Sequence, residues 1–276
     1  MSKQITLVLL LVSMAPGSVA GQSLFSAVGL GFPMESLDAR SIALGGVGVG
    51  LRGATILGTD PASAARIPVP MAVMTAQPSW VEFGRTDSDE SGSFRGSRFP
   101  SMGIAYPAWN YGIVTVSFES VFDQRYRAER TVSLDLLEGP VEATDQFVSE
   151  GGISHARFGF ARAVGERLSL GLSLGRYTGS ATRSLERGVP EDSLSTTVSP
   201  FVDPYETGGR WGFSGTSVTG GARLALGTVG HLGGSVTWSG GLNAEASEGT
   251  DGDDRSFDMP LQMRLGASAL LAPGLS

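Results

Sequence analysis

The chain of 276 residues contains no cysteine, only two histidines and 17% charged residues. Without cysteine it can form no disulfide, and it cannot be anchored as a lipoprotein through a modified cysteine. The formal net charge of −7 leaves no basic stripe for phosphates, so we expect no nucleic-acid partner. No apolar run reaches the length of about eighteen residues that a transmembrane helix requires.

Residues for catalysis or metal binding are equally scarce. Neither His155 nor His231 has a cysteine or a second histidine at a zinc-ligand spacing, and no G-x-S-x-G nucleophile elbow occurs. Gly48–Gly53 matches the G-x-G-x-x-G dinucleotide fingerprint, but no sustained helix follows it and no acidic residue lies about twenty positions on. These glycines are better explained by close backbone packing. The sequence predicts no enzyme, no catalytic residue, no metal and no cofactor.

The N-terminus has the three parts of an export signal. Lys3 precedes an apolar run over residues 5–15, and Ser18-Val19-Ala20 provides small residues at a cleavage site. We therefore expect residues 1–20 to be a signal peptide that is removed after Ala20.

The strongest pattern in the rest of the chain is a period of two. Apolar residues alternate with small or polar ones over 168–175, 232–239 and 261–269. A period of two predicts strands with one apolar and one polar face. In a soluble sandwich the apolar face would form the core, whereas in an outer-membrane barrel it faces lipid.

The predicted strands are long, and their connectors alternate in length. We expect strands over 71–84, 98–107, 111–124, 152–163, 167–180, 211–227, 231–244 and 257–272. Long loops are expected over 85–97, 125–151, 181–210 and 245–256, with tight turns between the others. Long loops on one side and tight turns on the other are typical of an outer-membrane barrel.

Aromatic residues fall near the ends of these strands. Trp80, Trp211 and Trp238 lie toward the long loops, and Trp109 and Tyr111 lie at a tight turn. Two belts of amphipathic rings are typical of the two interfaces of a membrane.

Residues 21–69 differ from the strands that follow. Residues 41–51 are small, apolar and glycine-rich. A turn then leads into a short helix, with Thr59 or Asp60 as its cap and Pro61 at its first position. We expect this segment to pack against or inside the sheet that residues 70–276 form.

Within this segment, residues 38–49 and 60–62 resemble the opening of FadL and PorV/PorQ-like outer-membrane proteins. Those proteins begin with a small residue, an arginine, an apolar stretch and a Gly-Gly pair, and continue to an Asn-Pro-Ala turn. The matching residues here are Arg40, Gly45, Gly46, Pro61 and Ala62, while Asp60 stands where the family usually has Asn. Asp offers the same capping oxygen.

The resemblance implies an all-β, antiparallel transmembrane barrel of about fourteen strands, with residues 21–69 as an N-terminal plug. Arg40, Gly45, Gly46, Asp60, Pro61 and Ala62 would then be plug residues. Because about eight strands are recognisable and the chain ends without a terminal aromatic strand, we expect an incomplete barrel that lacks about six strands. The ligand-lining residues cannot be carried over, because no strand motif matches.

The same resemblance implies a location in the outer membrane of a Gram-negative-type bacterium. FadL-type members carry fatty acids and other hydrophobic molecules through a lateral opening, whereas PorV-type members assist protein secretion and surface attachment. The implied partners are outer-membrane lipid and lipopolysaccharide, a hydrophobic small molecule and the barrel-assembly machinery. Passive uptake of a hydrophobic molecule is the leading hypothesis and a PorV-like role its alternative.

Three other classes remain open from the sequence. A closed eight-stranded barrel without a channel would act through its long loops as an adhesive or structural surface. An exported soluble sandwich would bury its apolar face. An outer-membrane hydrolase would need a serine, a histidine and an acid to meet in three dimensions.

Overall fold

The computed structural model describes residues 29–34, 38–46, 48–84, 91–136, 139–188, 205–227 and 229–269. The predicted signal peptide at 1–20 and the last residues from 270 onward lie outside this part of the chain. The elements are β1 (Phe32–Pro33), α3 (Ala39–Ala43), the 3-10 helix η1 (Pro61–Ala64), β2 (Met71–Gly84), β3 (Ser91–Ala108), β4 (Gly112–Asp123), β5 (Tyr126–Leu136), β6 (Gly139–Val164), β7 (Leu168–Gly188), β8 (Tyr205–Ala225), β9 (Gly230–Ala246), β10 (Arg255–Phe257) and β11 (Gln262–Ala269).

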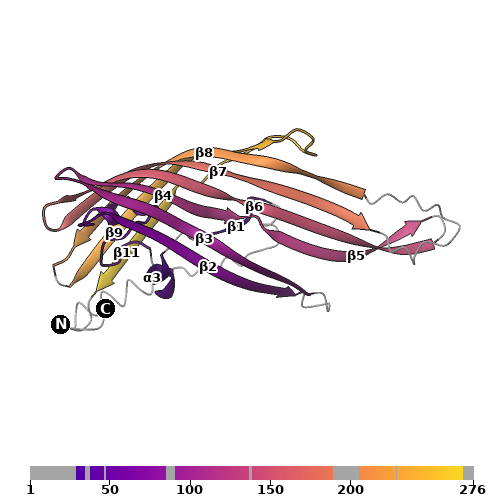
Figure 1. Cartoon of the computed structure of the whole chain (residues 1–276), viewed down its shortest axis with the longest axis horizontal. Coiled ribbons are helices and arrows are strands. Elements are labelled where there is room, and N and C mark those ends of the chain that lie inside the picture. The colour runs from indigo at the N-terminus through magenta and orange to yellow at the C-terminus, as the bar shows by residue number, and fades with distance from the viewer. Residues whose placement is uncertain are drawn as a thin grey trace.

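These strands form one antiparallel sheet of eleven strands (Figure 1). Its order is β10-β9-β8-β7-β6-β4-β3-β2, with β11 also on β9, β5 also on β6 and β1 on β4. No pairing among the described strands joins β2 to β10 or β11, so the sheet is not closed into a barrel. The all-β, antiparallel class predicted from the alternation is confirmed at this level.

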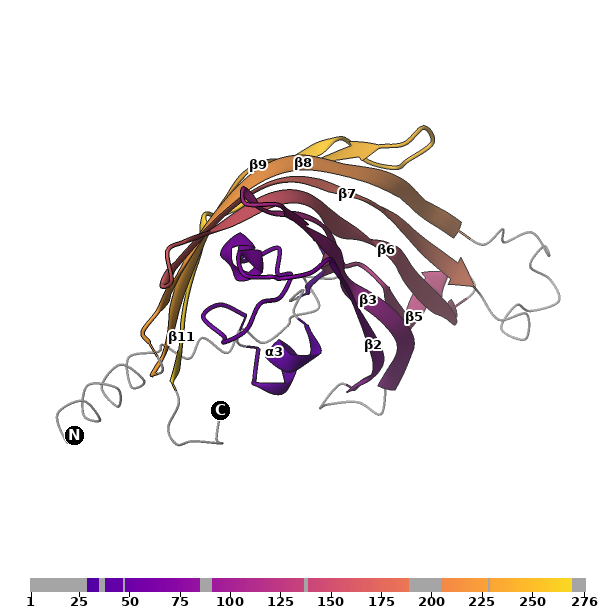
Figure 2. The ribbon, with the colours of Figure 1, turned by 60° about the vertical axis from the view of Figure 1, so that its left-hand side comes forward.

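The sheet curves around the chain that precedes it. Figure 2 shows helix α3 and the loops up to β2 on the concave side of the sheet. We call residues 38–46 and 48–67 the inner segment. Helix η1 of this segment lies against β6, β7 and β8, and an apolar cluster that includes Ile56, Ala64 and Ile67 packs on Ala105 and Ala161 of the sheet.

The predicted long loop over 125–151 is wrong. Strand β5 continues the path of β4, and the two strands together pair with nearly the whole of β6. Arg125 holds the junction, since its guanidinium binds both carboxylate oxygens of Asp123 at 3.0–3.1 Å. The prediction failed because charged residues are frequent in this hairpin, and Arg130 and Asp145, which face each other across it, interrupt its apolar face. Strands β3, β7 and β8 likewise extend into the regions predicted as loops over 85–97 and 181–210.

The predicted strand over 257–272 is broken. Strand β10 ends at Phe257 and β11 begins at Gln262, and both lie on the same edge of β9. Pro260 stands between them and cannot donate a ladder hydrogen bond, which accounts for the interruption.

Candidate functional site

The convex face of the sheet is apolar and exposed. One cross-strand row, fixed by the register, consists of Ile104, Val116, Phe158, Leu174, Val218 and Trp238. These side chains are 36–61% exposed. Large apolar residues at such exposure in a continuous row across six strands mark a contact surface rather than ordinary protein exterior.

The concave face shows the opposite composition. Many inward residues of the same strands are serine, threonine, glycine or charged, and the buried polar ones include Ser117, Arg157, Ser173, Thr219 and Thr237, beside an apolar cluster of Ile153, Tyr177, Phe213 and Leu242. A soluble protein buries its apolar residues and exposes its polar ones. This sheet reverses that distribution, and the inner segment covers its polar face.

Two glycines of the sheet leave space for the inner segment at Pro61 and Ala62. A Cβ on Gly171 of β7 would lie 2.4 Å from the backbone of both residues, and one on Gly221 of β8 would lie 2.8 Å from Asp60 Oδ1. Pro61 and Ala62 are buried there. At these two positions the absence of a side chain lets the inner segment pack directly on the sheet.

Asp60 forms an ion pair with Arg223 of β8. Its Oδ2 accepts from Arg223 Nε at 2.5 Å, and Asp60 is fully buried. Arg223 Nη1 also donates to the carbonyls of Leu51 and Gly53 at 3.1 and 3.3 Å. Burial raises the pKa of the Asp60 carboxyl, and the guanidinium of Arg223 opposes part of that rise. Asp60 is the N-cap residue of η1 and Pro61 begins the helix, as predicted, but the Asp60 side chain forms no capping hydrogen bond.

A second buried ion pair lies deeper in the concave face. Glu119 of β4 binds the guanidinium of Arg157 on β6, and its other oxygen accepts from the backbone N–H of Gly58 at 2.7 Å. His155 stacks on Tyr177 with ring centroids 4.0 Å apart and bonds Ser217 at 2.8 Å. The inner segment is therefore attached to the sheet at two separate points, by the ion pair of Asp60 with Arg223 and by the hydrogen bond from Gly58 to Glu119.

The remaining residues of the predicted plug motif hold the inner segment together locally. Arg40 donates from Nη1 to the carbonyl of Arg52 at 2.7 Å, which links α3 to the loop before η1. Gly45 and Gly46 follow the helix with φ of 80° and 85°. Leu44, the C-cap, and these glycines end a helix of only five residues that begins at the Asp38 cap. The motif residues therefore fall into two groups, one at α3 and one at η1.

The dinucleotide fingerprint at Gly48–Gly53 forms no helix. Gly50 lies against β11, where its Cβ would be 2.4 Å from the carbonyl oxygen of Gly266. Close backbone packing, as expected from the sequence, accounts for it.

The sheet is split at the point where β3 stops pairing with β4. Strand β3 pairs with β4 only from Ser101 to Ala108, and β1 takes over the freed edge of β4 through Phe32 and Pro33. Met34 continues this pairing by donating its N–H to the carbonyl of Val121 at 2.7 Å. The chain just before the inner segment thus supplies a short strand, β1, to the gap in the sheet.

Close packing holds this short strand in place. Gly31 has a φ of +94°, and a Cβ there would lie 2.5 Å from the carbonyl oxygen of Asp123. Arg183 donates to the carbonyl of Gly29 and, at 2.9 Å, to Gln124.

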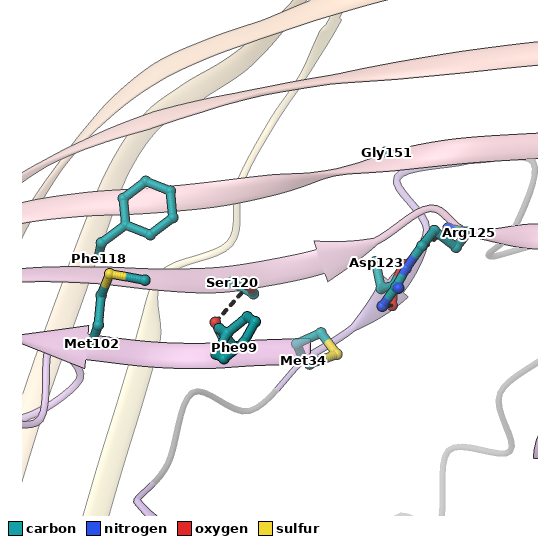
Figure 3. Close-up of a pocket in the computed structure, with 8 residues that line it drawn as sticks. All are labelled: Met34, Phe99, Met102, Phe118, Ser120, Asp123, Arg125 and Gly151. Carbon is teal, nitrogen blue, oxygen red and sulfur yellow. Dashed lines mark hydrogen bonds and ion pairs between the residues drawn. The ribbon is translucent and has the colours of Figure 1, made fainter. Parts of the chain in front are cut away.

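An open hollow of about 350 Å³ lies at this split, which we call the lateral hollow (Figure 3). Its apolar lining is Met34, Phe99, Met102 and Phe118, and Ser120, Asp123 and Arg125 line its polar end. Met102 and Phe118 also belong to the exposed convex face. The hollow is therefore continuous with the apolar exterior of the sheet.

A second cavity of about 240 Å³, the inner chamber, lies on the concave side. It is lined by both charged residues of the deeper ion pair, by His155 and Tyr177, and by Met34. Met34 therefore borders both spaces, and a methionine side chain is flexible enough to adopt several positions there.

Four of the five predicted aromatic positions, Trp109, Tyr111, Trp211 and Trp238, can be compared with the belt hypothesis. Trp109 is 89% exposed at the tight turn after β3, and Tyr111 is exposed beside it. Trp211 lies toward the long-loop end of β8, as predicted, but it packs against the apolar cluster of Ile153, Tyr177, Phe213 and Leu242, with Arg183 5.7 Å from its ring, and so does not belong to an outward belt. Trp238 lies in the middle of β9, in the exposed convex row, and not near a strand end. The side chain of Trp80 lies outside the described residues.

Sequence reasoning missed Glu119, Arg157 and Arg223, which build the site. Each lies on the face of its strand that carries small and polar residues, and the adjacent residues in the strand point to the exposed apolar face. A charged residue at such a position was the available signal, because it must meet an opposite charge on the covered face.

No family model, curated protein or solved structure matches this chain. Among the described residues, no helix is long and apolar enough to cross a membrane. No group of three or more His, Asp or Glu that could hold a metal ion occurs in the same part of the chain.

The fit of the inner segment can be tested at its glycines. Gly171→Ala is expected to lower the free energy of unfolding by about 1–3 kcal/mol, because the new methyl group overlaps the backbone of Pro61 and Ala62. Gly220→Ala on the convex face, where no atom lies within 4 Å, is the control and is expected to be neutral. Urea unfolding followed by tryptophan fluorescence measures both, and equal effects would contradict the fit.

Proposed function

We propose that the convex face lies in a bacterial outer membrane and meets lipid. The exposed apolar rows and the buried polar face support this, since outer-membrane strands alternate apolar outward and polar inward. The outward residues of β6 from Val164 to Ala156 cover about 27 Å along the strand. With the usual tilt this approaches the apolar band of about 25 Å of such proteins. Arg162 is the charged residue among these outward positions. It lies near the tight turn, where its side chain can extend to the interface.

The aromatic residues of the tight turn support the same placement. Trp109 adopts a φ of 46°, which is unusual for a residue other than glycine, and its indole extends from the molecule. Trp109 and Tyr111 would then lie at the periplasmic interface, where amphipathic rings are favoured.

The function we propose is passive passage of a hydrophobic small molecule, of the long-chain fatty acid type, between the outer membrane and the interior. The lateral hollow at the split between β3 and β4 carries this proposal. Its apolar lining adjoins the lipid-facing surface at Met102 and Phe118, and Met34 separates it from the inner chamber. An apolar solute could move along such a lining without crossing a polar surface, because burial of its chain is favourable throughout.

This function involves no covalent step, and the chain's own residues bind and gate. Met34 would have to swing aside, and the pairing of β1 with β4 would have to loosen. The implied partners are outer-membrane lipid, lipopolysaccharide, the barrel-assembly machinery that inserts the chain and the hydrophobic ligand itself.

Photo-crosslinking tests the proposal. The full chain is inserted into lipid vesicles with a trace of diazirine-bearing long-chain fatty acid, and labelled residues are located by mass spectrometry. We expect label on Met34, Phe99 and Met102. The double variant Phe99→Ala/Met102→Ala is expected to lower the labelling of Met34 by at least about tenfold. The reason is the loss of two apolar side chains whose burial contributes about 1.5–3 kcal/mol each.

Leu174→Ala, on the convex face away from the split, is the matched control and should leave the labelling of Met34 unchanged. Label spread evenly over the convex face, with Leu174 labelled as strongly as Met34, would show general lipid contact and overturn the proposal.

A further inference from the structure

A third cavity lies between the inner segment and the sheet at the end where the tight turns are. Its volume is about 170 Å³, and we call it the basic pocket. The polar side chains that line it are Arg66, Arg167, Arg223, His231, Ser63 and Ser169. Arg167 belongs to the turn between β6 and β7, and His231 is the second residue of β9. The pocket is separate from both the lateral hollow and the inner chamber.

The charge of this lining is one-sided. Three guanidiniums and an imidazole line the pocket, and no carboxylate of the described part of the chain does. Asp60 is fully buried, binds Arg223 Nε and is not part of the lining. Glu166 lies in the turn beside Arg167, is exposed and does not line the pocket.

Two nitrogen atoms of the lining are buried without a hydrogen-bond partner among the described residues. They are Arg223 Nη2 and His231 Nδ1. The Arg223 side chain is only 7% exposed, and its Nε and Nη1 are already used by Asp60 and by two carbonyls. Buried polar atoms are nearly always paired, so an unpaired guanidinium nitrogen in a cavity of this size indicates a ligand that accepts hydrogen bonds.

Arg66 contributes a fixed charge at the mouth of the pocket. Its Nη2 donates to the carbonyl of Gly165 at 3.1 Å, which attaches the inner segment to the turn between β6 and β7. The serine hydroxyls of Ser63 and Ser169 complete a lining that is rich in donors.

We propose that the basic pocket binds a small oxyanion of the phosphate class. A guanidinium that is fixed by three other bonds presents its free nitrogen in a set direction, which suits a phosphate oxygen. Arg167, in the turn between β6 and β7, and His231, near the start of β9, line the same pocket and face the same ligand. The same chemistry is offered by inorganic phosphate and by the phosphate of a lipid headgroup at the rim. This inference does not depend on the passage of a hydrophobic molecule.

Phosphorus NMR of the full chain in a phosphate-free detergent tests the proposal, with inorganic phosphate as the probe at constant ionic strength. Wild type is expected to broaden and shift the phosphate resonance saturably. Arg167→Gln is expected to weaken binding by about tenfold, because one charge-assisted contact is lost. Arg162→Gln, which removes an exposed arginine of the convex face five residues away, should leave binding unchanged.

Arg223→Lys provides a second variant. It retains a cation beside Asp60 but lacks the second guanidinium nitrogen, so it should also weaken phosphate binding by about tenfold. If this variant does not fold, Arg167→Gln still decides. Absence of saturable binding by wild type, or equal weakening by Arg162→Gln and Arg167→Gln, would overturn the proposal.

Dihexanoyl phosphatidic acid, a soluble lipid with a phosphate headgroup, identifies the source of the oxyanion. Competition with inorganic phosphate at more than about tenfold tighter affinity would support a lipid headgroup as the ligand. Equal affinity would support the free anion.

Discussion

Replacing Arg223 by methionine is expected to lower the free energy of unfolding by about 3–5 kcal/mol. The substitution leaves the fully buried carboxylate of Asp60 without its partner, and it removes the donor to Leu51 and Gly53. Methionine fills a similar volume, so the loss is mainly electrostatic. Urea unfolding of the chain in detergent micelles, followed by tryptophan fluorescence, measures the change.

The double variant Asp60→Asn/Arg223→Met separates the ion pair from its surroundings. Because burial raises the pKa of Asp60 in spite of Arg223, the pair itself contributes little net stability. We expect the double variant to recover more than half of the loss. A double variant that is as unstable as the sum of the single variants would show that the two residues do not act as a pair. Arg162→Met on the convex face serves as the control and is expected to change stability by less than about 0.5 kcal/mol.

The strands of the sheet could be predicted because the period of two is a local signal. Strand β2 begins at Met71 and ends at Gly84, as the alternation predicts, and β9 differs from its prediction by one or two residues at each end. Strand β5 was missed although Tyr126, Ala128 and Val132 alternate with polar residues, because Arg130 and its cross-strand neighbour Asp145 interrupt the apolar face of the hairpin.

The candidate site was less predictable, because it forms between residues far apart in the chain. Asp60 and Pro61 were singled out through a resemblance, but their partners Arg223 and Gly171 lie in strands without any matching motif. Alternation assigns Arg223 to the polar face without indicating which loop covers it. The register of β8 against β7 and the path of the inner segment decide that pairing, and neither is local.

The lateral hollow depends on the same long-range geometry. Met34 lies outside every predicted strand, and Met102 and Phe118 read from the sequence as ordinary members of an apolar face. Only the early end of the pairing between β3 and β4, at Ser101 and Glu119, brings the three together.

Leu174→Arg is expected to have the largest effect on insertion into lipid. Leu174 is the centre of the exposed row, between Phe158 and Val218. If this row meets the bilayer, an arginine there costs about 2–4 kcal/mol of folding free energy in vesicles. The fraction of chain that inserts, measured as the unheated band of altered electrophoretic mobility, should fall accordingly.

Thr182→Arg on the same strand is the matched control. Thr182 is also exposed, but it lies beyond the apolar rows, where we place the headgroups, and an arginine there is expected to cost less than about 1 kcal/mol. An exported soluble sandwich would give a different result, because an arginine on a solvated surface changes stability by less than about 0.5 kcal/mol at either position. Equal behaviour of the two variants, together with a chain that stays dispersed without detergent, would therefore refute a lipid-facing convex surface. A loss confined to Leu174→Arg would show that the apolar face has lipid rather than water as its solvent.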